Sequence, residues 1–149
     1  MKNTFRCKCP ITSALDILGD KWSLVVIKQM LFEGKSMFKD FTDSPEATAT
    51  NILSARLKTL EDFGIIYKQK LPTNRKTNIY TLTPKGLSLV PVLVEFTLWS
   101  KNHVQDFNPD MNLDEKLEWV EKNKEAAFKQ IAESYKEYKQ SLLKVKKDE

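Results

Sequence analysis

One stretch, from Ala47 to Phe63, constrains the fold of this chain more than any other, because its pattern fits only a helix. Neither Gly nor Pro interrupts it. Its apolar side chains recur at spacings of four, four and three residues, which places them on one helical face. They are Ala49, Leu53, Leu57 and Leu60, with Ile52 on the flank. The stripe predicts an amphipathic helix that packs against a core and ends at Gly64.

The opposite face of this helix is unusual for a solvated surface, which normally mixes long charges of both signs. Its side chains are short, hydrogen-bonding or basic, and they are Thr48, Thr50, Asn51, Ser54, Ala55 and Lys58. Small polar side chains allow close approach to another surface. A DNA major groove admits one helix whose Asn or Thr can reach base edges. The pattern therefore predicts a DNA recognition helix.

The neighbouring segments predict a winged helix-turn-helix. A short helix over 38–42 and a turn of Ser, Pro and Glu at 44–46 come before the recognition helix. After it, 65–71 and 78–82 indicate two antiparallel strands, and the polar, basic loop 72–77 between them is the expected wing. The fold class is expected to be mainly α with a small β-hairpin.

Two helices are expected ahead of this motif. Thr12 or Ser13 can cap a first helix that runs to Leu18, with Gly19 in a left-handed turn after it. The second helix, over 21–32, is apolar nearly all round, which is typical of the central buried helix of a domain.

A further helix is expected from Thr83 to about Trp99, and Pro91 should kink it or divide it in two. Its apolar side chains cover more than one face, which is more than a domain of this size buries alone. We expect one side to pack on its own domain. The other side, with Leu93, Phe96 and Trp99, is expected to form a homodimer.

The chain is expected to divide near residue 106. Residues 1–106 form the winged helix-turn-helix and dimerisation domain, and residues 107–149 form a C-terminal helical extension. After a linker at 107–110, the segment 114–147 has apolar residues near heptad spacing, which predicts one amphipathic helix of roughly 50 Å. The extension has nine bases and ten acids, so it is expected to lie on the domain or on the partner subunit rather than on DNA.

Composition argues against several classes of protein. No apolar run of 18 residues and no signal-peptide pattern is present, so we expect a cytoplasmic protein without a membrane partner. Two cysteines and one histidine are too few for a four-ligand metal site, and no Gly-rich phosphate loop or carboxylate cluster is present. We therefore expect no metal, no cofactor and no enzymatic activity.

Positive charge is concentrated around the recognition helix and the wing. Residues 56–85 carry seven bases and two acids, a net charge of +5 in a chain whose total is +4. A partner with a phosphate backbone would explain this concentration, and a solvated surface would show it equally.

Several short motifs in one register resemble HxlR-type (MarR-like) winged helix-turn-helix transcriptional regulators. The resemblance runs roughly from Cys7 to His103, which leaves the C-terminal extension outside it. The matching segments are Cys9-Pro10, 14–23, 38–41, 49–53, Arg56-Leu57, Leu60-Glu61, Gly64-Ile65-Ile66, Tyr80-x-Leu82-Thr83-x-x-Gly86, Pro91-Val92-Leu93 and Trp99.

This resemblance implies a homodimeric repressor or regulator that binds double-stranded DNA at an inverted-repeat operator, with one recognition helix per half-site. Such proteins often control their own gene or neighbouring detoxification, redox or metabolic genes. Some similar proteins sense oxidants, aldehydes or quinones through the cysteine that occupies the place of Cys9. The alternative function is a winged-helix protein-interaction module without specific DNA binding.

The DNA-binding candidates of the recognition helix are Thr48, Ala49, Thr50, Asn51, Ser54 and Lys58. Asn51 can pair with adenine and Thr50 can meet a thymine methyl group, or both can serve as helix caps. We expect Ser54 and Lys58 at phosphates or sugars.

Arg56 borders the apolar stripe, so it can contact DNA or pair with the acids at 61–62. In the wing the candidates are Asn74, Arg75 and Lys76. Arg75 and Lys76 are expected at the DNA backbone or minor groove, with a solvated turn as the alternative.

Cys9 fits three roles. It can be a small buried hydrophobe. It can be a sensor thiol whose pKa the nearby Arg6, Lys8 and Lys2 lower. It can also be half of a metal site together with Cys7.

Overall fold

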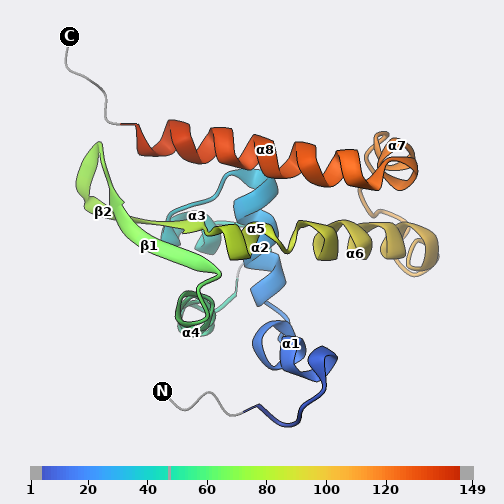
Figure 1. Ribbon diagram of the computed structural model, residues 1–149, viewed down its shortest axis with the longest axis horizontal. Helices are drawn as coiled ribbons and strands as arrows, with labels where there is room; N and C mark the ends of the chain where they lie inside the picture. Colours follow the sequence, from blue (N-terminus) through green and yellow to red (C-terminus); the bar gives the residue numbers. More distant parts are fainter. Residues whose placement is uncertain (1–4, 47, 145–149) are drawn as a thin grey trace.

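The computed structural model describes residues 5–46 and 48–144, and the expectations for Lys2, Ala47 and the end of the tail helix at Lys147 lie outside these residues. The described residues form helices and one antiparallel hairpin, which lies at one edge of the molecule (Figure 1). This confirms the predicted fold class. None of the helices within residues 5–46 and 48–144 has the length and hydropathy of a membrane span. The elements in chain order are α1 (Pro10–Leu18), α2 (Ser23–Glu33), α3 (Phe38–Thr42), α4 (Thr50–Asp62), β1 (Ile66–Leu71), β2 (Asn74–Leu82), α5 (Pro84–Leu87), α6 (Val90–His103), α7 (Leu117–Lys122) and α8 (Lys124–Leu143).

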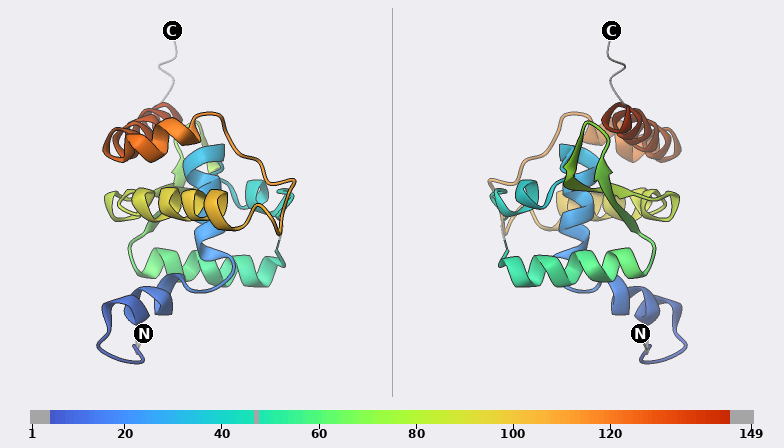
Figure 2. Two further views of the ribbon diagram at one scale, coloured as in Figure 1. Left: turned by 90° about the vertical axis from the view of Figure 1, so that its right-hand side faces the viewer. Right: turned by 90° about the vertical axis from the view of Figure 1, so that its left-hand side faces the viewer.

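α2 forms the centre of the core, as its apolar sequence predicts. It runs through the middle of the molecule, with α4 at one end and α8 at the other (Figures 1 and 2). Ile27 and Met30 of α2 are fully buried and cluster with Leu53, Leu57 and Leu60 of α4. Because each buried leucine contributes about 1.5–3 kcal/mol, this stripe fixes α4 to the core.

The first helix begins earlier than predicted. α1 starts at Pro10, because Pro is favoured in a first helical turn, where its missing N–H is not needed. Cys9 is the N-cap, and the predicted caps Thr12 and Ser13 lie within the helix. The predicted left-handed turn at Gly19 is also wrong: its φ is −80°, since its N–H still bonds to a carbonyl of the last turn.

The β-hairpin is longer than predicted. β2 begins at Asn74, within the segment 72–77 that was expected to be a loop. Lys70 lies opposite Asn78 but Leu71 lies opposite Asn74, so the three residues between form a bulge in β2. A bulge leaves extra residues of one strand unpaired, which explains why this polar segment lacks the alternation of a regular strand.

The helix expected after the wing is divided in two, one of the two outcomes predicted for Pro91. α5 ends at Leu87 and α6 begins at Val90. Pro91 lies in the first turn of α6, because Pro in a helix interior would remove a hydrogen bond and clash with the preceding turn.

The C-terminal extension forms two helices rather than the single helix predicted. α7 and α8 meet at Asn123, whose φ of −134° and ψ of 48° are not helical. The side-chain amide of Asn123 donates to the Trp119 carbonyl at 2.9 Å. An Asn side chain that bonds to the local backbone competes with helix continuation, so the predicted long helix breaks here.

α8 lies on its own domain and covers an edge of the hairpin. The hydroxyl of Tyr135, which is buried, accepts a hydrogen bond from the Leu82 N–H at 2.7 Å. The Lys139 ammonium donates to the Leu82 carbonyl at 3.0 Å. Unpaired strand edges are prone to aggregation unless they are covered, and α8 satisfies both backbone groups at the end of β2.

Candidate nucleic-acid interface

α4 presents the polar face that the sequence predicts. Thr50, Asn51, Ser54 and Lys58 are exposed, while the leucine stripe on the other side is buried. α4 runs along one edge of the molecule (Figure 2). A helix placed at an edge, with short polar side chains outward, has the geometry needed to enter a major groove.

α4 begins at Thr50, later than predicted. Ala49 has extended backbone angles and is the N-cap. It is exposed rather than part of the core stripe, which therefore starts at Leu53, and Thr48 is half-buried ahead of the helix. Neither Thr50 nor Asn51 serves as the cap. Both lie in the first turn, where backbone N–H groups lack helical partners and favour an anion such as a phosphate.

Arg56 is anchored within the domain. Its Nη1 lies 3.7 Å from the Asp20 carboxylate, so neither acid at the end of α4 is its partner. Asp20 also accepts hydrogen bonds from the N–H groups of Trp22 and Ser23 at 2.8 and 2.9 Å. Burial acts to raise the pKa of Asp20, but these hydrogen bonds, that of the Ser23 hydroxyl and the charge of Arg56 hold it below its usual value. This cluster ties α4 to the start of α2.

Two other bases near α4 also have partners. Lys58 pairs with Asp62 at 2.9 Å but stays exposed, and the hydrogen bond and charge of Asp62 raise the pKa of Lys58. Exposed pairs of this kind contribute little to stability, so Lys58 remains available to a phosphate. Lys85 donates to the Phe63 carbonyl at 2.6 Å. Phe63 is the C-cap of α4, where the helix dipole favours a positive charge.

The wing carries exposed bases on both strands. Arg75 and Lys76 lie in the bulge of β2, and Lys68 and Lys70 lie on β1. Lys68 and Lys70 were included in the net charge of the sequence but were not predicted to contact DNA. Their position in the strand that follows the recognition helix could have predicted such a contact. The Asn74 carboxamide accepts from the Lys76 N–H at 3.2 Å, so Asn74 shapes the turn.

Cys9 is exposed at the start of α1, so its role as a buried hydrophobe is wrong. The backbone N–H and hydroxyl of Thr12 and the N–H of Ile11 lower the pKa of the Cys9 thiol. Arg6 bonds to Asp16 instead. Among the described residues, no group of three or more His, Cys, Asp or Glu side chains is placed to hold a metal ion. The Cys9 thiol is therefore exposed and has a pKa below its ordinary value.

α6 shows which of its apolar residues are free for a partner. Leu93 was expected at a dimer contact, but it is buried in the core of its own chain. Phe96 and Trp99 are 55% and 59% exposed. Together with Pro91 and Val92 they line a shallow apolar groove.

The exposed helix followed by a basic wing has counterparts among known proteins. The family model described as HxlR-like helix-turn-helix matches residues 17–108. The chain belongs to this family. The HxlR-like match ends before α7 begins at Leu117, so the C-terminal extension lies outside it.

Individual relatives agree with this assignment. The HTH-type transcriptional regulator YodB of Bacillus subtilis (strain 168) is 37% identical over 93 residues, which cover 62% of this chain and 82% of YodB. The crystal structure of PA1607 matches with a TM-score of 0.63 and 33% identity, over 73% of each chain. The reduced form of YodB matches with a TM-score of 0.54 and 34% identity, over 70% of this chain and 100% of that chain. This HxlR-like protein is therefore a DNA-binding transcriptional regulator.

Proposed function

We propose that this HxlR-like protein is a homodimeric repressor that binds an inverted-repeat operator and is controlled by modification of Cys9. The observation that carries the proposal is the exposed first turn of α4, where Thr50 and Asn51 project from a helix fixed by its buried leucine stripe. Asn and Thr at this place can read base edges. Ser54, Lys58 and the bases of the wing then contact the backbone.

The exposed apolar side chains support the proposed dimer. Phe96 and Trp99 project from α6, and Ile11 and Leu15 project from α1, a helix without a buried residue. Large exposed apolar groups mark protein interfaces. A twofold dimer places two copies of α4 about 34–36 Å apart, in successive turns of the major groove.

Control through Cys9 rests on its exposure and on the donors that stabilise its thiolate. Solved structures of YodB include reduced, diamide-treated and quinone-bound forms. The Cys9 thiolate would add to an electron-poor ring carbon of a quinone, and the ring would take up a proton to give a hydroquinone thioether. Because Cys9 caps α1, which carries part of the proposed dimer surface, such an adduct would disturb the dimer.

Selection of binding sites from random duplex DNA tests the proposal. The expected result is an inverted repeat with half-sites one helical turn apart. Binding that selects no sequence, or no salt-dependent binding at all, would favour a protein-interaction module instead.

A mobility-shift assay on the selected site with and without benzoquinone tests the control. Wild-type protein and Cys7→Ser should release the DNA, whereas Cys9→Ser should keep it. Release of DNA by Cys9→Ser to the same extent as by the wild type would rule out Cys9 as the sensor.

A further inference from the structure

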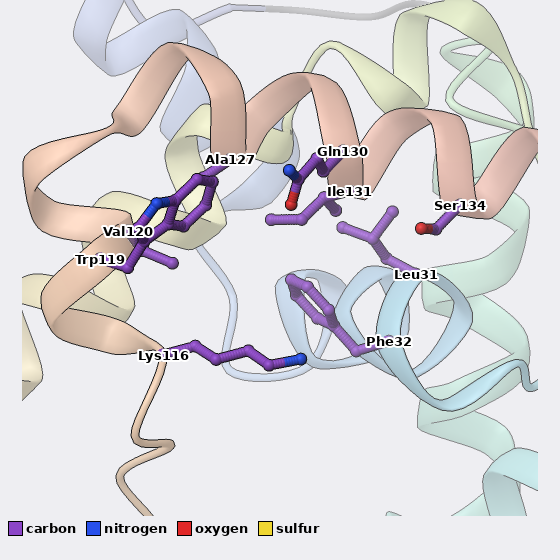
Figure 3. A pocket seen from close by; sticks show the side chains of 9 residues that line it. All are labelled: Leu31, Phe32, Lys116, Trp119, Val120, Ala127, Gln130, Ile131 and Ser134. Atoms are coloured by element: carbon purple, nitrogen blue, oxygen red, sulfur yellow. The ribbon is translucent and has the colours of Figure 1, made fainter.

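A cavity of about 640 Å³ lies where α2 meets the C-terminal extension. Leu31 and Phe32 of α2 form one wall (Figure 3). α7 and α8 form the others, so most of the cavity is built by the part of the chain outside the family match. Sites for small molecules commonly have volumes of about 300–1,000 Å³, and this cavity falls within that range.

The apolar lining is suited to a flat ring. Phe32 and Trp119 face the cavity from opposite sides (Figure 3) and are 50% and 42% exposed, although both are large aromatic side chains. Val120, Ala127 and Ile131 complete the apolar surface. Aromatic rings gain from offset or edge-to-face packing beyond the burial of area, so a ligand ring held between Phe32 and Trp119 would cover surface that the chain itself leaves open.

Lys116 is the one charged residue among the described residues that line the cavity. Lys116 extends along one side of the cavity, with its ammonium group toward Phe32 (Figure 3). Gln130 and Ser134 of α8 add an amide and a hydroxyl on one wall. Across residues 5–46 and 48–144, Lys116 forms no ion pair, and no carboxylate lines the cavity. A carboxylate can accept hydrogen bonds from an ammonium group, from an amide N–H or from a hydroxyl.

We propose that this cavity binds an aromatic carboxylate, with the ring between Phe32 and Trp119 and the carboxylate at Lys116, and that the ligand modulates DNA binding through α8. The second half of this proposal rests on the proposed function. α8 connects the cavity to the wing. Its residues Gln130, Ile131 and Ser134 line the cavity, and its next turn contacts the last residue of β2.

The connection runs through backbone hydrogen bonds. Tyr135 follows Ser134 directly and accepts from the Leu82 N–H, and Lys139 donates to the Leu82 carbonyl. Leu82 is the last residue of β2, the strand that carries Arg75. A ligand that shifts or fixes the first half of α8 therefore acts on the position of the wing. A ligand can shift the wing between two positions only if it binds the protein more tightly in one of them. The factor by which the ligand changes the affinity for DNA must then equal the factor by which DNA changes the affinity for the ligand.

Isothermal titration of the full chain without DNA tests the site. The probes are 2-naphthoate and its neutral analogue 2-naphthylmethanol. Wild-type protein should bind naphthoate more tightly, and Lys116→Gln should weaken naphthoate by about tenfold, the loss expected for one charge-assisted hydrogen bond, while leaving naphthylmethanol unchanged. The matched control Lys122→Gln, on α7 but outside the cavity lining, should bind both probes as wild type.

The aromatic wall has its own matched pair. Phe32→Ala should weaken both probes, whereas Phe107→Ala, which removes an exposed ring outside the cavity, should weaken neither. No saturable binding of naphthoate, an equal affinity for the two probes, or an equal effect of Lys116→Gln and Lys122→Gln would overturn the site.

Fluorescence anisotropy with the selected DNA tests the coupling. Naphthoate should change the DNA affinity of the wild type at least threefold and should leave that of Phe32→Ala unchanged. DNA binding that naphthoate does not alter would overturn the coupling. A protein that binds naphthoate but no DNA would contradict the proposed function and leave the titration result standing, so the two failures are distinguishable.

Discussion

The hydrogen bond between Tyr135 and Leu82 gives a stability prediction with a defined size. Tyr135→Phe keeps the ring but removes the hydroxyl that accepts from the Leu82 N–H at 2.7 Å. Leu82 is buried, and an unsatisfied buried donor costs about 1–3 kcal/mol. For a chain of this length, about 2 kcal/mol lowers the melting temperature by about 4–8 °C.

The matched control is Tyr138→Phe. The Tyr138 hydroxyl donates to the Gly34 carbonyl at 2.6 Å, but this bond is exposed, so water can replace the lost donor. Thermal unfolding followed by circular dichroism should show the larger loss for Tyr135→Phe. Equal losses for the two variants, or no loss for Tyr135→Phe, would refute this account of how α8 holds the wing.

The same residue predicts a pH dependence. Burial raises the pKa of Tyr135 from 10.0 to about 12, against the hydrogen bond from Leu82, which lowers it. Because the pKa of Tyr135 is higher in the folded state than in the unfolded state, the folded protein holds this proton more tightly. The resulting contribution to stability is fully present below pH 10.0 and is lost as the pH rises toward about 12. Wild-type protein should therefore lose more stability than Tyr135→Phe across this interval in alkaline unfolding titrations.

Three further predictions concern the thiol, the dimer and the core. The pH–rate profile of Cys9 alkylation should have its midpoint below that of a peptide thiol, and Thr12→Val should move it upward, because this change removes the Thr12 hydroxyl, one of the groups that lower the pKa of Cys9. Phe96→Ser with Trp99→Ser should lower the mass seen by analytical ultracentrifugation from that of a dimer to that of a monomer. The monomeric variant should still unfold in one cooperative thermal transition. Leu57→Ala should cost about 2–5 kcal/mol in denaturant unfolding, because Leu57 is buried in the core between α4 and α2.

The elements that could be predicted from the sequence are those whose burial is set by local periodicity. Leu53, Leu57 and Leu60 identified the buried side of α4, and the all-round apolar sequence of α2 identified the centre of the core. Short-range patterns decide these features, so no knowledge of distant contacts was needed. The outward placement of Thr50 and Asn51 follows from the same stripe.

Other features depend on contacts or local geometry that the periodic pattern does not encode. The salt bridge from Arg56 to Asp20 joins residues 36 positions apart, so the nearer acids were the natural expectation. The first part of β2 was predicted to be a loop, because the bulge that contains Arg75 interrupts the alternating pattern of a strand. The break at Asn123 followed from a single side-chain hydrogen bond within an otherwise helical sequence.

The cavity at α7 and α8 could not be predicted, because it exists only once the extension packs on α2. Its lining residues, such as Phe32 and Trp119, are far apart in the sequence. A long amphipathic helix was predicted for the extension, and its apolar positions were assigned to packing alone. Because the helix breaks at Asn123, α7 runs in a different direction from α8, and the cavity lies between α2, α7 and α8.

The most direct test of the central claim, that the first turn of α4 reads bases while the wing holds the backbone, compares two double variants across salt concentrations. Thr50→Ala with Asn51→Ala should lose discrimination between operator and scrambled DNA, at about 1–3 kcal/mol per lost base contact. Arg75→Ala with Lys76→Ala should weaken binding to both DNAs and reduce the slope of log K against log salt by about two. An equal loss on both DNAs from both pairs would contradict the account.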